Sequence, residues 1–228
     1  MKIYSVLGGA FFFAAATSVS ATPIAMSPLS TNGCSGAVVT VSATSIDWAP
    51  DGGSSGCIVT GSAITYNSGT PLPIGTLGTI LDLPAGPLPV LDFMTFTGHP
   101  DLHFDLLGIG PGPSNTDCAS LANFEVCAAF AGSPFSLQLL NGQSVVSLGA
   151  FGVAYDAVAP NSTWSGSFSV TISDKTPAQI QAIILAGGSV QSTHAGNFTL
   201  VATPEPATLG ITGLALLALG MFRKKLRK

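Results

Sequence analysis

The chain has 228 residues, of which 46% are hydrophobic and 8% are charged, and its formal net charge is −4 at pH 7. Without the two ends the balance is more acidic, because residues 22–202 hold one lysine against ten acidic side chains, a net charge near −9. This composition excludes the basic surface that nucleic-acid binding requires, and it disfavours binding to anionic membranes or acidic glycans.

The first 21 residues have the layout of a secretory signal peptide. Lys2 supplies a positive charge, and residues 6–16 form an apolar stretch. Small residues at positions 19 and 21 predict cleavage after Ala21. Because the first cysteine is Cys34, the junction does not fit a lipoprotein. We therefore predict an exported chain whose β-rich part, residues 22–202, forms one domain.

Four cysteines lie in this exported part, and an even number in an oxidising compartment indicates disulfides. Three pairings are possible, and proximity in the sequence favours Cys34 with Cys57 and Cys118 with Cys127. A zinc site is disfavoured, because no C-x-x-C pair occurs and no histidine lies near these positions. We interpret all four cysteines as structural and expect no cofactor and no metal.

Alternating apolar and small polar residues predict a mainly β fold. The clearest strand is 162–173, and Asn141-Gly142 predicts a tight hairpin turn. Short strands separated by Gly and Pro favour an antiparallel β-sandwich, with residues 69–89 and 108–113 as long loops. Further strands are expected at residues 37–41, 57–66, 90–97, 102–107, 135–140, 144–148, 151–155 and 196–202.

One short helix interrupts the strands. Thr176 can cap its start, Pro177 suits its first turn, and Gln179 completes a capping box. Gly187 and Gly188 then supply a stop. We expect this helix to pack over an end or an edge of the sheet.

The best candidate for a functional site is residues 99–105, His-Pro-Asp-Leu-His-Phe-Asp. On a strand, His99, Asp101, His103 and Asp105 would share one face, and imidazole and carboxylate are plausible metal ligands. Strand residues two apart lie about 6.5 Å from each other, however, so three of them rarely reach one ion. The competing interpretation, which we favour, is the exposed polar face of an amphipathic strand.

Catalytic signatures are missing elsewhere in the sequence. There is no nucleophile elbow, no phosphate-binding loop, no zinc-protease motif and no dinucleotide fingerprint. Asp47 beside Trp48 could line a sugar site, but Trp48 and Trp164 fit core positions better. Asp51-Gly52-Gly53 fits a turn better than a calcium loop. We therefore predict a protein without enzymatic activity and without catalytic residues.

The last 26 residues, 203–228, form a separate unit. The rigid acidic tripeptide Pro204, Glu205 and Pro206 leads into an uncharged stretch, 207–222. As a helix this stretch would cover about 24 Å of a hydrocarbon core of roughly 30 Å, a short transmembrane span that snorkelling Arg and Lys side chains can extend. Five cations follow, and such clusters normally remain in the cytoplasm, so the body would lie across the membrane. These stop residues are Arg223, Lys224, Lys225, Arg227 and Lys228.

This order of tripeptide, apolar helix and basic end resembles the PEP-CTERM sorting tail of Gram-negative bacteria. The resemblance covers residues 203–228 only. It implies recognition by a membrane-embedded exosortase, processing near Pro204-Glu205-Pro206, and a link to export and extracellular polysaccharide. Some ice-binding proteins carry a similar tail, but residues 22–202 contain no regular T-x-T ladder that would support ice binding.

Taken together, the sequence predicts an exported cell-surface or extracellular-matrix protein with a structural or adhesive β domain. Its partners would be an exosortase-type enzyme, the membrane through the C-terminal helix, and extracellular polysaccharide, with no nucleic acid. One alternative stays open, a secreted glycan-binding module or a hydrolase. That module would use Trp48 or Trp164, and the hydrolase a metal site at His99, Asp101 and His103.

Overall fold

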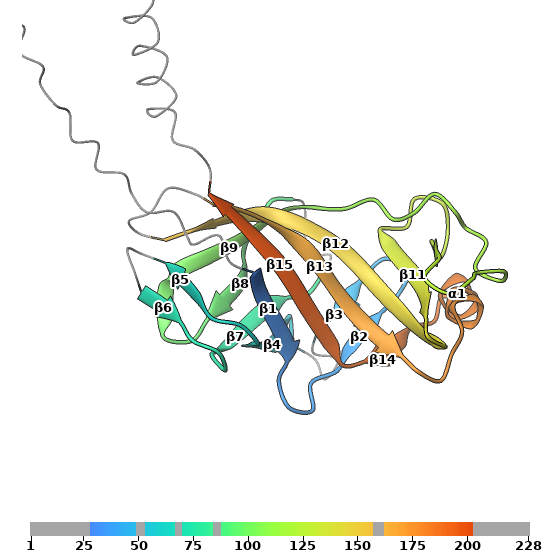
Figure 1. Cartoon of the computed structure of the whole chain (residues 1–228), viewed down its shortest axis with the longest axis horizontal. Coiled ribbons are helices and arrows are strands. Elements are labelled where there is room, and N and C mark those ends of the chain that lie inside the picture. The colour runs from blue at the N-terminus through green and yellow to red at the C-terminus, as the bar shows by residue number, and fades with distance from the viewer. Residues whose placement is uncertain (1–27, 49–52, 67–69, 84–87, 157–161, 203–228) are drawn as a thin grey trace, which may run out of the picture.

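The computed structural model describes residues 28–48, 53–66, 70–83, 88–156 and 162–202. These ranges contain fifteen strands and one helix, whose arrangement is visible in Figure 1. In chain order they are β1 (Pro28–Gly33), β2 (Val39–Val41), β3 (Ile46–Asp47), β4 (Ser55–Thr60), β5 (Ile64–Tyr66), β6 (Thr70–Leu72), β7 (Leu77–Leu81), β8 (Val90–Phe96), β9 (His99–Ile109), β10 (Val126–Cys127), β11 (Phe135–Leu140), β12 (Gln143–Tyr155), β13 (Ser162–Ile172), α1 (Pro177–Leu185), β14 (Val190–Ser192) and β15 (His194–Ala202).

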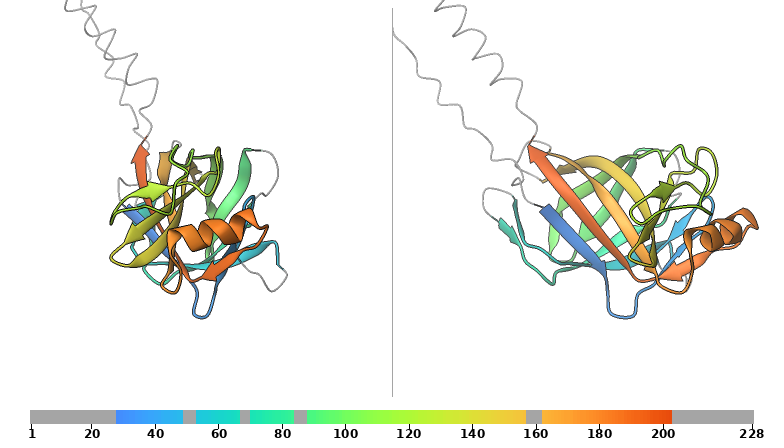
Figure 2. Two further views of the ribbon diagram at one scale, coloured as in Figure 1. Left: turned by 90° about the vertical axis from the view of Figure 1, so that its right-hand side faces the viewer. Right: turned by 45° about the vertical axis from the view of Figure 1, so that its right-hand side comes forward.

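The main sheet closes on itself, and this closure corrects the predicted sandwich. Eight of its ten strands form a ring in the order β12–β13–β15–β1–β4–β7–β8–β9, and β9 pairs again with β12, all antiparallel. The domain is therefore a closed antiparallel barrel rather than two stacked sheets, and Figure 2 shows its strands curving around one interior. Closure satisfies the backbone groups that a sandwich leaves unpaired at its edge strands.

The long strand β12 makes this closure possible. One of its edges pairs with β13 from Ser144 to Ala154. Its other edge is shared by two strands. Residues 143–148 pair with β11 (Phe135–Leu140), and residues 150–155 pair with β9. The sequence suggested two separate strands here, 144–148 and 151–155. The structure instead has one 13-residue strand that continues through residues 149 and 150.

Two other predicted elements, the hairpin turn at Asn141-Gly142 and the start of the helix, agree with the structure. Asn141 and Gly142 both have positive φ, 50° and 82°, as a type I′ hairpin turn between β11 and β12 requires. The helix begins as predicted, with the side chain of Thr176 accepting from the Gln179 amide and the Gln179 side chain accepting from the Thr176 amide. Two predictions were wrong: β6 and β7 lie within the expected loop 69–89, and the expected strand 57–66 is two strands, β4 and β5.

A chain of five aromatic rings in contact with one another lies in the barrel interior. Their contacts run from ring to ring at centroid separations of 4.8–6.4 Å. The rings belong to Trp48, Phe93, Trp164, Phe168 and Phe198, each at most 2% exposed. The Trp164 indole N–H donates to the carbonyls of Asp105 and Val153, both at 3.1 Å, and so links the interior to the β9–β12 junction. Side chains therefore fill the barrel interior along most of its length.

One buried polar side chain stands apart within this core. His194, at the start of β15, is 4% exposed and lies edge-on to Trp48 with ring centroids 4.8 Å apart. Neither of its ring nitrogens has a hydrogen-bond partner among the described residues. Burial lowers the pKa of His194 from 6.5 to about 4, because the charged imidazolium would lose its hydration.

This burial predicts acid-sensitive stability. The unfolded chain takes up the His194 proton near pH 6.5 but the folded barrel only near pH 4, so the unfolded state binds more protons between these values. The contribution of His194 to the free energy of unfolding should therefore be fully present above pH 6.5. It should fall by up to about 1.4 kcal/mol per pH unit as the pH drops toward 4. Urea unfolding at a series of pH values measures this loss.

His194→Phe should remove this contribution, so the difference in stability between the wild type and the variant should change across the same pH window. Phe198→Leu is the matched control, since it disturbs a buried ring on the same strand without removing a titrating group. If His194→Phe kept the wild-type pH profile, the acid sensitivity would have another source.

Candidate functional site

The run from His99 to Asp105 forms most of β9, and its two faces separate as the alternation predicted. Leu102 and Phe104 are fully buried in the barrel, while His99, Asp101 and His103 are half-buried on the outer side. Asp105 differs from the prediction of a solvated face, because it is only 6% exposed.

His99 engages the β5–β6 hairpin. Its Nδ1 lies 2.7 Å from the hydroxyl of Tyr66, which also lies 3.3 Å from Asp101 Oδ1 as a donor. Burial first, and the Asp101 carboxylate second, raise the pKa of Tyr66 to about 12, because both disfavour a phenolate. Tyr66 therefore stays protonated at physiological pH and can donate to either neighbour.

His103 engages a different partner. Its Nδ1 lies 2.5 Å from Asp92 Oδ1, and its ring stacks on Tyr155 with centroids 5.0 Å apart. Asp92 sits in an irregular part of β8, has a φ of 52°, and donates its amide hydrogen to Asp105 Oδ1 at 2.8 Å. Positive φ in a non-glycine residue costs energy, and here the carboxylate of Asp105 holds the strained backbone of Asp92 in place.

The two histidines thus have separate partners, Tyr66 for His99 and Asp92 for His103. Within the described ranges, no three His, Cys, Asp or Glu side chains gather as metal ligands. The contacts found at the histidines are to a phenol and a carboxylate, and neither is the activated hydroxyl or thiol that an acyl-transfer site uses. The geometry favours a structural polar network on the outer face of β8 and β9.

Both tryptophans are core residues, as the sequence favoured. Trp48 and Trp164 are each 1% exposed, and both contact the other interior rings. An aromatic platform for a sugar must present its face to solvent. Neither tryptophan presents a face to solvent, so the open alternative of a sugar site on Trp48 or Trp164 finds no support in the structure.

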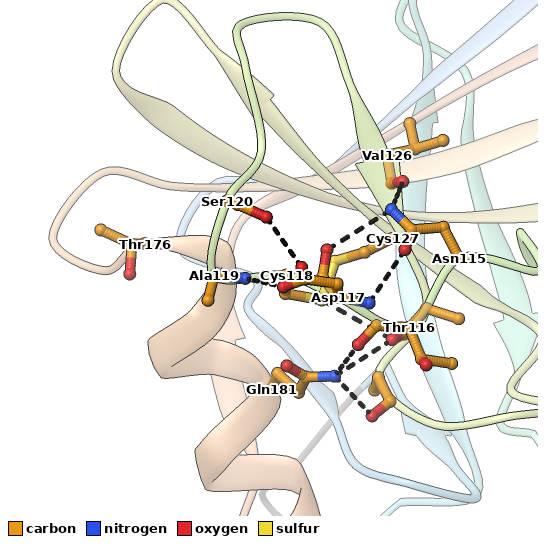
Figure 3. Close-up of a disulfide and its surroundings, with 12 residues drawn as sticks. Asn115, Thr116, Asp117, Cys118, Ala119, Ser120, Val126, Cys127, Thr176 and Gln181 are labelled. Atoms are coloured by element: carbon orange, nitrogen blue, oxygen red, sulfur yellow. Dashed lines mark hydrogen bonds between the residues drawn. A yellow bond between two sulfur atoms is a disulfide. The ribbon is translucent and has the colours of Figure 1, made fainter.

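The cysteines pair as proximity favoured, Cys34 with Cys57 and Cys118 with Cys127. The first disulfide ties the loop after β1 to β4. The second lies in the segment between β9 and β11, and Figure 3 shows how side chains hold that segment. Gln181 of α1 donates to the carbonyl of Thr116 at 2.8 Å and to that of Ala129 at 3.1 Å, which fixes the helix against the disulfide.

The remaining predicted residues lie outside the described ranges. These are Ala21 at the signal cleavage point, the tripeptide Pro204, Glu205 and Pro206, the apolar stretch 207–222, and the basic end Arg223, Lys224, Lys225, Arg227 and Lys228. Asp51 and Gly52 of the expected turn also lie outside them. Within the described ranges, no helix combines the length and apolarity that a membrane crossing demands.

Sequence reasoning missed the partners of the two histidines, Tyr66, Asp92 and Tyr155. Tyr66 and Asp92 lie 33 and 11 residues away from the histidines they bind. Tyr155 lies on β12, directly opposite His103 in the strand pair that closes the barrel. No local pattern marks any of the three, because strand pairing alone brings them together.

Comparison of the chain with protein-family models, curated proteins and solved structures finds no match.

Proposed function

We propose that this protein is exported by a Gram-negative bacterium and sorted by its C-terminal tail to the cell surface or extracellular matrix. There its β domain has a structural or adhesive role and no enzymatic activity. The observation that carries the proposal is the pairing of all four cysteines in two disulfides within the described residues. Such pairing supports an oxidising compartment, in agreement with the signal-peptide layout and the tail.

The structural features of the outer surface support a role without catalysis. The His99 and His103 contacts hold neighbouring strands together, and both tryptophans are sealed in the core. No observation favours the hydrolase or the tryptophan-based glycan module over this proposal. Turnover of glycan or ester substrates by the purified protein, lost in His103→Ala, would overturn the non-enzymatic assignment.

Sorting by the tail predicts a specific processing defect. Replacing Pro204, Glu205 and Pro206 together by alanine should leave full-length chain in the membrane fraction, because the proposed exosortase would no longer recognise its substrate. The measurement is the size and location of the chain in cell fractions by immunoblotting. Thr203→Ala is the matched control and should behave as the wild type. Unchanged processing and location of the triple variant would contradict the proposed sorting.

A further inference from the structure

A cavity of about 180 Å³ opens at one end of the barrel, between β8, β9, β12 and the β2–β3 turn. Its inner wall is made of Ile46, Val90, Leu106 and Leu148, which are at most 7% exposed. At its mouth Leu88 and Ile109 are 47% and 37% exposed, so the cavity is accessible from solvent.

The lining of this cavity is almost wholly apolar. Among the described residues that line it, none is charged and only Thr44 and Ser45 have polar side chains. The Ser45 hydroxyl is already bonded to that of Ser42, with the oxygens 2.6 Å apart. An ordered water needs two to four polar partners. This wall offers too few, so water in the cavity is easily displaced by an apolar group.

The inner end of the cavity limits what can enter. Ile46, Phe135 and Leu148 also line a void of only about 10 Å³ on the inner side, beyond which Trp48 and Phe168 occupy the core. A long acyl chain or a polycyclic molecule therefore has no room to continue into the barrel. An apolar cavity of about 150 Å³ engineered in another protein binds benzene. The cavity described here has a similar volume, about 180 Å³, and could hold a molecule of that size.

We propose that this cavity is a binding site for a small uncharged apolar molecule, of the size of one aromatic ring or a short alkyl chain. The mouths of barrels are common ligand sites, with mostly apolar walls and few polar groups. The size and chemistry of the cavity identify this class of ligand, and neither depends on the export or sorting of the chain.

Toluene is the direct probe, and methyl NMR of the full chain is the measurement. Toluene should cause saturable shifts in the methyl signals of Val90, Leu106 and Leu148, whereas benzoate, of similar shape but charged, should cause none. Val90→Phe fills the cavity and should weaken toluene binding at least tenfold. Val201→Phe adds the same ring on an outward-facing position that is 46% exposed, and should bind as the wild type does.

Ile109→Trp provides a second test, because it obstructs the mouth at a partly exposed position and should also weaken binding. The wild-type titration locates the ligand by itself, so the test survives a Val90→Phe chain that fails to fold. The proposal is overturned by non-saturating shifts, by shifts spread away from the cavity, or by equal binding of benzoate. Folded Val90→Phe with wild-type affinity would overturn it too.

Discussion

Replacing Gly152 by alanine should lower the free energy of unfolding by at least about 3 kcal/mol. A β-carbon at this position would lie 1.8 Å from the backbone oxygen of Asp105 and 2.7 Å from the indole of Trp164. The first neighbour is main chain of β9, which cannot rotate away, and its oxygen also accepts the Trp164 hydrogen bond. Gly152 stands at the register shift where β12 meets β9, so the added methyl group would push apart the two strands that close the barrel.

Gly149→Ala is the matched control on the same strand. The nearest atom to its added β-carbon would be the Cα of Gly110 at 3.8 Å, an ordinary van der Waals distance. We expect Gly149→Ala to stay within about 0.5 kcal/mol of the wild type. Urea midpoints of the three proteins measure the difference, and equal midpoints for the two variants would contradict closure through a tight β9–β12 contact.

Removing the disulfide between Cys34 and Cys57 should cost about 3.5 kcal/mol, from the loop-entropy relation for residues 23 apart in sequence. This pair isolates the cross-link from packing, since Cys57 is exposed and Cys34 is half-buried. Replacing both residues by serine therefore leaves little cavity behind. By contrast, Cys118 and Cys127 are at most 3% exposed, so their replacement would also disturb the core.

The free energy of unfolding of Cys34→Ser/Cys57→Ser, compared with the oxidised wild type, measures this contribution. The single variant Cys34→Ser is a useful control, because it already lacks the cross-link and should lose about the same stability as the pair. A double variant as stable as the wild type would mean that the disulfide does not constrain the unfolded chain.

Features that depend on neighbours in sequence were predictable. The alternation in residues 162–173 places Trp164 and Phe168 inside the barrel. The cap of α1 forms from Thr176 and Gln179, which are three residues apart, and the hairpin at Asn141-Gly142 needs only two residues of suitable φ. Each of these depends on contacts within a few residues, so local chemistry determines it.

Closure of the sheet was not predictable in the same way. A sandwich and a barrel share the same inward and outward alternation, and they differ only in which strands pair. Here the deciding pair is β9 with β12, whose contacting residues, such as His103 and Tyr155, are distant in sequence. The polar network at His99 and His103 has the same origin, since β5, β8 and β12 supply its other members, Tyr66, Asp92 and Tyr155.

The most direct test of the proposed export and sorting is the intact mass of the native protein from cell-surface fractions, measured without reduction. Our account predicts a chain that begins at Thr22, ends near Pro204 and is four hydrogens lighter than the reduced form, because both disulfides have formed. A chain that still ends at Lys228 would contradict processing of the tail, and four free thiols would contradict folding in an oxidising compartment.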